Sequence, residues 1–184
     1  MKAPPVRVFL YWKCMIVIRE AQHNDMPELR EVAISSYRDA FASFNTPENM
    51  EAYFLGSYNL ATLYLELTEP DSKLFLACQD EKIVGFSRLR ESNEVADLLG
   101  MNVVELQRLY VLTELQGKSV GKLLMEASLH YAKEKRYDCL WLGVWERNFK
   151  AQSFYNKWGF ENFSEHVFWM GDDAQTDWLL KKKL

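Results

Sequence analysis

The chain has few of the residues from which metal sites and disulfide frameworks are built. Its 184 residues include only three cysteines and three histidines. Cys14, Cys78 and Cys139 form no CxxC pair, and the histidines show no metal-ligand spacing. We therefore expect reduced thiols, a cytoplasmic location and no bound metal.

Long apolar runs and a strong positive charge are also missing. Residues 1–14 have a cationic start and a short apolar run, but Pro4 and Pro5 interrupt them and no small-residue cleavage site follows. These features predict neither a signal peptide nor a membrane anchor. The formal net charge of −4 argues against indiscriminate binding of nucleic acid and favours cationic partners.

What the chain does have is the composition of one globular domain. Hydrophobic residues make up 48% and charged residues 26% of a length that can bury one sizeable core. The segment that begins at Met15 predicts a strand followed by a capped helix. We therefore place a single domain at residues 15–184 and an extension at residues 1–14.

Helix caps and apolar periodicity predict the elements of the first half of the chain. Asn24 or Asp25 can cap the first helix, which has Pro27 near its start, and Thr46 can cap the second. Two β-rich stretches joined by a short polar turn predict a hairpin. The predicted elements are a strand at residues 16–20, a helix after residue 25, helices opening at residues 47 and 60, and hairpin strands at residues 73–79 and 82–90.

The second half predicts a strand, a helix, a strand, a helix and two closing strands. Alternation in the strand at residues 103–112 would place Glu105 on the same face as Leu109 and Val111, with Tyr110 on the other face. This order of elements indicates an α/β protein with a mixed sheet. The other elements are a helix from Val120 to about residue 136, a strand at 138–145, a helix from Asn148 that stops at Gly159, and strands at 160–170 and 176–181.

The turn before the helix at Val120 predicts an anion site. It reads "QGKSVGK", and the first residues of the helix carry no carboxylate that could occupy the positive end of the helix dipole. A nucleotide P-loop does not fit, because Gly117 to Lys122 is one residue too short and Leu123 cannot bind magnesium. A GxGxxG dinucleotide fingerprint does not fit either, since that motif follows the first strand of its domain.

This turn resembles the acetyl-CoA turn of the Gcn5-related N-acetyltransferases. Their usual pattern is Gln or Arg, two residues, Gly, one residue, then Gly or Ala, and Ser119 stands at the middle glycine. The segment "WLGVWERNFKAQSFYNKWGF" is similar to the family's second signature, in which an Asn opens a helix and a Tyr follows seven residues later. With "TPENMEAYF" and "FWMGDDAQTDWLL", the chain from Met15 to its end is similar to the PaiA-type polyamine acetyltransferases.

The resemblance implies a central, mostly antiparallel twisted sheet with a splayed parallel strand pair, flanked by helices. It also implies acetyl-CoA as a cosubstrate that is held mainly by backbone groups, with no metal. The implied cofactor-binding residues are Leu109, Tyr110, Val111, Gln116, Gly117, Lys118, Ser119, Val120, Gly121, Lys122 and Asn148.

Acetyl transfer to an amine needs proton transfer at two places. The amine must be neutral, although an amine with a pKa of about 10.4 is almost fully protonated at pH 7. Glu105 is the candidate base, and Tyr155 is the expected proton donor to the leaving thiolate. A free amide near Leu109 would stabilise charge on the carbonyl oxygen. Simpler interpretations are a helix cap for Asn148, a core aromatic for Tyr155 and a surface charge for Glu105.

The resemblance further implies a small-molecule amine acceptor, specifically a polyamine such as spermidine or spermine. Asp39, Glu48 and Glu51 are the candidate ligands for its remote ammonium groups, and each also fits a solvated helix surface. The alternatives are a protein N-terminus, a lysine or an amine drug as acceptor, or a regulatory domain that binds CoA without turnover. The sequence fixes neither the acceptor nor whether the protein forms a homodimer.

Overall fold

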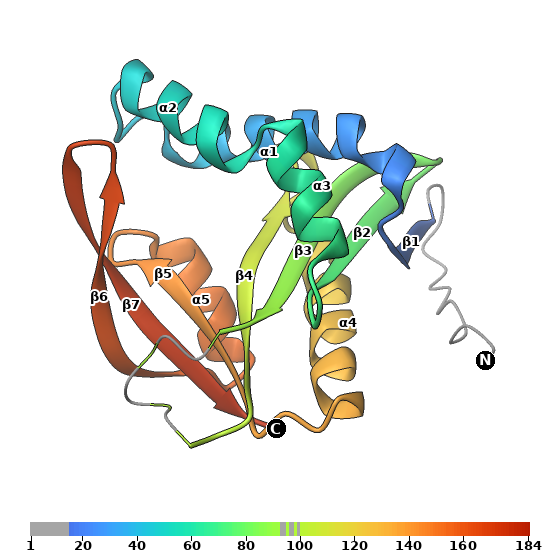
Figure 1. Cartoon of the computed structure of the whole chain (residues 1–184), viewed down its shortest axis with the longest axis vertical. Coiled ribbons are helices and arrows are strands. Elements are labelled where there is room, and N and C mark those ends of the chain that lie inside the picture. The colour runs from blue at the N-terminus through green and yellow to red at the C-terminus, as the bar shows by residue number, and fades with distance from the viewer. Residues whose placement is uncertain (1–14, 93–94, 96–97, 99) are drawn as a thin grey trace.

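A twisted seven-stranded sheet forms the centre of the computed structural model, which describes residues 15–92, 95, 98 and 100–184 (Figure 1). The expected extension at residues 1–14 lies outside the described residues. The strand order is β1-β2-β3-β4-β5-β7-β6, and the pair β4–β5 is parallel while the other neighbouring pairs are antiparallel. This confirms the predicted α/β class and the mixed sheet. The strands are β1 (Ile16–Glu20), β2 (Lys73–Gln79), β3 (Lys82–Glu91), β4 (Val103–Val111), β5 (Cys139–Trp145), β6 (Glu161–Met170) and β7 (Asp173–Lys183).

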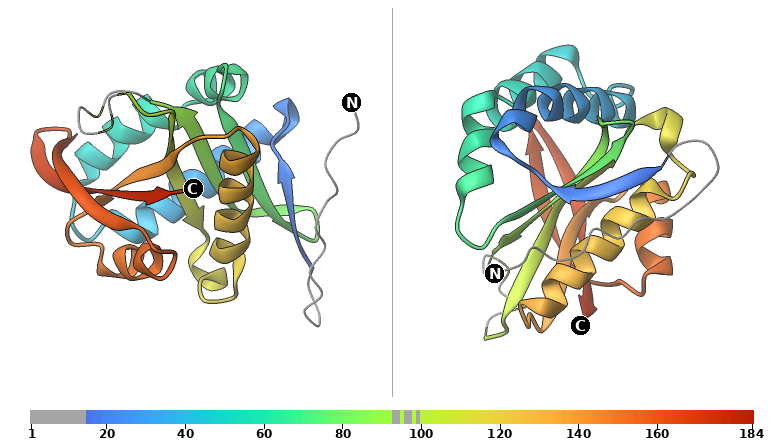
Figure 2. Two further views of the ribbon diagram at one scale, coloured as in Figure 1. Left: turned by 90° about the horizontal axis from the view of Figure 1, so that it is seen from below. Right: turned by 90° about the vertical axis from the view of Figure 1, so that its right-hand side faces the viewer.

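The helices form a layer on each face of the sheet (Figure 2). One layer contains α1, α2 and α3, and the other contains α4 and α5. Among the described residues, none of the helices combines the length and the apolar character needed to span a membrane. The helices are α1 (Met26–Phe41), α2 (Pro47–Ser57), α3 (Leu60–Thr68), α4 (Val120–Glu134) and α5 (Phe149–Lys157), with short 3₁₀ turns η1 (His23–Asp25) and η3 (Thr113–Leu115).

Local sequence signals explain several element boundaries. The Thr46 side chain accepts a hydrogen bond from the Asn49 amide at 3.2 Å, so the predicted cap of α2 is confirmed. Asp80 and Glu81 have φ values of 49° and 68°, as a two-residue hairpin turn between β2 and β3 requires. Gly159, with φ of 77°, follows α5 as predicted.

The parallel strands β4 and β5 pair over a short distance and then separate. Their register runs from Val103 opposite Cys139 to Glu105 opposite Trp141. Beyond that point β5 continues to pair with β7 up to Trp145, whereas β4 continues to pair with β3. The edge of β4 that faces β5 is therefore unpaired by β5 from Leu106 onward. This is the splayed pair that the family resemblance implied.

A β-bulge in β4 corrects the predicted alternation. Arg88 of β3 lies opposite Arg108 and the next residue, Leu89, lies opposite Leu106, so Gln107 is an extra residue on β4. An extra residue reverses the faces on one side of the bulge. Leu106 therefore packs in the same apolar cluster as Leu109, on the α4 side.

The prediction that Glu105 shares a face with Leu109 and Val111 is therefore wrong. Val103, two residues before Glu105, packs with Trp141 in a separate cluster, while Val104 packs on the α4 side. Glu105 consequently faces the side of the sheet that carries α1, α2 and α3.

Candidate active site

The turn before α4 has the geometry of an anion site. Gly117 and Ser119 both have positive φ, 79° and 66°, and the first intrahelical hydrogen bond runs from the Leu123 amide to the Ser119 carbonyl at 3.1 Å. The amides at the start of the helix therefore have no acceptor within α4. The first turn contains no acidic side chain. Backbone donors and the helix dipole together fit a phosphate-bearing ligand such as CoA.

Side chains connect this turn to β4 and α5. Gln116 Nε2 donates to the Val111 carbonyl at 3.1 Å, and Lys150 of α5 bonds to Gln116 Oε1. A Cβ added at Gly121 would lie 3.8 Å from both Leu109 and Phe154. The turn is thus held against the end of β4, beside the unpaired strand edge, and the predicted donor-binding residues of β4 and the turn are brought together.

Ser119 adopts the left-handed conformation that its family position suggests, at a steric cost to the fold. Replacing Ser119 with glycine should raise the free energy of unfolding by about 1 kcal/mol, because glycine has no Cβ to clash in this region. Urea unfolding measures the change.

The matched control for this change is Gly117→Ser. An added Cβ at Gly117 would meet no atom within 4 Å, so only its φ of 79° opposes a side chain. We expect this variant to lose about 1 kcal/mol. A Ser119→Gly protein less stable than the parent would contradict the assigned strain.

Tyr155 lies on the buried face of α5. Its ring packs against Phe154 and Phe160, with centroids 5.4 and 5.8 Å away, as a core aromatic would. Burial raises the pKa of its hydroxyl. Burial above all also raises the pKa of Tyr110 of β4, and Tyr155 lies close enough to contribute to that increase. Tyr155 therefore stays protonated at neutral pH near the separated strands, which suits a proton or hydrogen-bond donor.

The start of α5 is held by two polar side chains. Asn148 Oδ1 accepts a hydrogen bond from the Ala151 amide at 3.1 Å, so the structural interpretation of Asn148 as a cap is confirmed. Gln152 Nε2 donates to the carbonyls of Trp145 and Glu146 at 3.0 and 2.8 Å. Sequence analysis missed Gln152, although a polar residue on an otherwise apolar helix face is a signal. Gln152 fixes α5 against the end of β5.

Glu105 occupies the last paired position of β4 before the strands separate. Its side chain is 11% exposed, and Arg90 Nε donates to Glu105 Oε2 at 2.6 Å. Trp141 lies directly opposite on β5. The carboxylate is therefore mostly buried, oriented by a guanidinium and located on the face opposite α4. This environment does not match the alternative interpretation of Glu105 as a simple surface charge.

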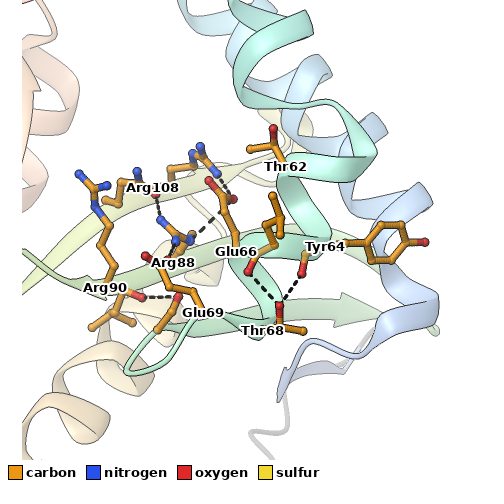
Figure 3. Close-up of polar contacts among 12 residues, drawn as sticks. Thr62, Tyr64, Glu66, Thr68, Glu69, Arg88, Arg90 and Arg108 are labelled. Atoms are coloured by element: carbon orange, nitrogen blue, oxygen red, sulfur yellow. Dashed lines mark hydrogen bonds and ion pairs between the residues drawn. The ribbon is translucent and has the colours of Figure 1, made fainter.

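A row of arginines on β3 and β4 ties α3 to the sheet (Figure 3). Arg108 Nη1 donates to Glu66 Oε2 at 2.6 Å, and Arg88 bonds to Glu69 and to Gln107. Arg88 is 2% exposed, and burial lowers the pKa of its guanidinium. Because Arg88 holds the side chain of Gln107, the row also stabilises the bulge.

The three acids proposed to bind remote ammonium groups lie on exposed helix surface. Asp39 of α1 accepts a hydrogen bond from Thr113 Oγ1 at 2.8 Å, and Glu48 and Glu51 are on the outer surface of α2. In the described ranges no group of three or more His, Cys, Asp or Glu side chains could hold a metal ion.

Separated parallel strands beside an anion-binding turn fit the donor site of an N-acetyltransferase. Comparison with known proteins then gives the family. Residues 29–160 match the family model described as Acetyltransferase (GNAT) family, and the chain belongs to this family.

Relatives extend over nearly the whole chain. An uncharacterized N-acetyltransferase of Lactobacillus delbrueckii subsp. lactis is 34% identical over 169 residues, covering 92% of this chain and 98% of that protein. A spermidine N(1)-acetyltransferase of Thermoplasma acidophilum is 31% identical over 173 residues, covering 91% and 97%. The crystal structure of the PaiA N-acetyltransferase of the same species, in complex with coenzyme A, has a TM-score of 0.78 at 27% identity and covers 92% of this chain and 99% of that chain.

Proposed function

We propose that this protein transfers the acetyl group of acetyl-CoA to a primary amine of a polyamine such as spermidine or spermine, within a ternary complex. The observation that carries the choice of acceptor is the 31% identity with the spermidine N(1)-acetyltransferase over 91% of the chain. The net charge of −4 also favours a polycationic acceptor. The buried, free thiols of Cys78 and Cys139 support a cytoplasmic location.

The two ends of the donor would meet different parts of the site. The amides at the start of α4 and the turn from Gln116 to Lys122 would hold the pyrophosphate, and the unpaired edge of β4 at Leu109 to Val111 would accept the pantetheine arm. Bound acetyl-CoA supplies the thioester. An amide on this edge of β4 would then donate to the acetyl carbonyl oxygen as negative charge develops there.

Two side chains would move the protons. Glu105, directly or through a water molecule, takes a proton from the acceptor ammonium, which leaves the nitrogen lone pair free to attack the acetyl carbon. As the C–N bond forms and the C–S bond breaks, Tyr155 donates a proton or hydrogen bond to the sulfur, and the acylated nitrogen releases its second proton through water, which restores the hydroxyl of Tyr155. Because the amine attacks directly, the protein needs no nucleophile of its own.

The acceptor is tested by a panel of amines scored for CoA release. We expect spermidine and spermine to exceed a mono-amine of similar length by at least about tenfold in kcat/KM, with a smaller advantage at high salt because salt screens the remote charges. A peptide N-terminus, a lysine peptide or an aminoglycoside acetylated faster than either polyamine would overturn the polyamine assignment. Binding of CoA without release from acetyl-CoA with any amine would instead support a regulatory domain.

A further inference from the structure

Gly143 is an exposed residue in β5, a strand whose other residues are buried or partly buried. Alternation places Gly143 on the same face as Trp145, whose ring meets Phe41 and Phe44 with centroids 6.1 and 4.9 Å away. Solvent therefore reaches the sheet at Gly143 on the face that carries α1 and α2, which is also the face of Glu105.

Two polar side chains of the β6–β7 hairpin stand over this glycine. A Cβ added at Gly143 would lie 3.5 Å from Asp177 Oδ2 and 3.8 Å from His166 Nε2. The register places Asp177 opposite both Trp145 and His166, so all three share one face. His166 Nε2 lies 3.8 Å from Asp177 Oδ2, and the Asp177 side chain is only 18% exposed.

The charges around this position favour a cation. The Asp177 carboxylate raises the pKa of His166 against the opposing effect of burial, and the charge of Glu105 adds to the increase. Burial above all raises the pKa of Tyr37 on α1, and Asp177 contributes to that increase too. The negative potential of Asp177 thus extends from the hairpin to the helix layer above the sheet.

We propose that Asp177 binds a protonated amino group of the acceptor over Gly143, with His166 as a positioning residue that orients the carboxylate. We call Gly143, His166 and Asp177 the amine subsite. The proposal rests on the proposed function for the identity of the acceptor, an aliphatic amine with at least two ammonium groups. Glu105 would receive the proton of the reacting amine while Asp177 holds another charge of the same molecule.

The absence of a side chain at position 143 is part of this subsite. The distances of 3.5 and 3.8 Å from an added Cβ are ordinary contacts, so alanine fits the fold. An alanine methyl group would nevertheless occupy the space directly beneath the Asp177 carboxylate. Gly143→Ala therefore offers a second variant that obstructs the subsite without changing any charge.

The first test compares Asp177→Asn with Asp172→Asn. Asp172 lies in the same hairpin and is exposed, so both variants remove one negative charge from the same part of the protein. We expect Asp177→Asn and Gly143→Ala to raise the KM for spermidine at least about tenfold, with the KM of a mono-amine and the acetyl-CoA affinity changed less than about twofold. Asp172→Asn should leave all three constants unchanged.

The second test uses pH. Protonation of His166 adds a positive charge beside Asp177, so the KM for spermidine should rise as the pH falls through the raised pKa of His166. Asp177 of β7 and Glu105 of β4 are the charged groups that act on this imidazole. His166→Gln should lose this pH dependence relative to the parent protein, and a pH profile of KM that is identical in both would overturn the positioning role.

Other outcomes separate this proposal from the proposed function. Equal increases in KM for Asp177→Asn and Asp172→Asn, or equal increases for spermidine and the mono-amine, would overturn the subsite. If the parent protein acetylates only other amines, the polyamine assignment fails, and calorimetric titration with spermidine then decides the subsite. Binding that is lost in both Asp177→Asn and Gly143→Ala would support it, and binding that persists in either variant or is absent in the parent would overturn it.

Discussion

Replacing Tyr155 with phenylalanine will lower kcat about 100-fold and leave the affinity for acetyl-CoA nearly unchanged, because a positioned proton donor contributes a factor of about 10² to 10⁴. The change removes only the hydroxyl, so the ring contacts with Phe154 and Phe160 remain. Steady-state kinetics and calorimetric titration with acetyl-CoA measure the two quantities.

A suitable control removes the hydroxyl of Tyr137, which follows the C-terminal end of α4. The Tyr137 hydroxyl donates to Glu91 Oε1 at 2.8 Å. Tyr137→Phe should therefore reduce stability by about 1 kcal/mol without lowering kcat. If Tyr155→Phe keeps full activity at every pH tested, Tyr155 is only a core residue.

Replacing Glu105 with glutamine should lower kcat/KM for a polyamine by about 10² at neutral pH, because the amide cannot accept the proton of the ammonium. Glu105 lies at the point where β4 and β5 separate, and its Oε2 accepts a hydrogen bond from Arg90 at 2.6 Å. The loss should shrink as the pH approaches the pKa of the amine, since more of the acceptor is then neutral. A profile of kcat/KM against pH measures both effects.

The comparison variant for this prediction is Glu91→Gln, which makes the same chemical change at the end of β3. Its partner is Tyr137, and Glu91 lies opposite Val104 of β4, which packs on the α4 side of the sheet and not on the face of Glu105. We expect no change in the shape of its pH profile. A Glu105→Gln enzyme whose profile coincides with that of Glu91→Gln would rule out Glu105 as the base.

Features that are determined by residues close together in the sequence were predictable from the sequence. The caps at Thr46 and Asn148 are confirmed by their hydrogen bonds, and Gly159 ends α5 with positive φ. The hairpin turn at Asp80 and Glu81 is confirmed as well. In each case the physical cause lies within about four residues of the chain.

Features that depend on pairing between distant segments were not predictable. The bulge at Gln107 appears only in the register of β4 with β3, and it reversed the expected face of Glu105. The approach of Asp177 and His166 to Gly143 likewise depends on the register of β5, β7 and β6. Alternation within one strand contains no information on either arrangement.

The extra residue in β4 has a consequence for how related sequences are aligned. A strand can lose one residue and still pair, and deletion of Gln107 would restore simple alternation while the carboxylate of Glu105 kept its present face, opposite α4. The turn that begins at Gln116 would keep its own sequence. A relative that lacks the bulge but is aligned here without a gap would therefore match Glu105 to a residue on the α4 face, and conservation of the donor signature alone would not establish that the two proteins share the same base.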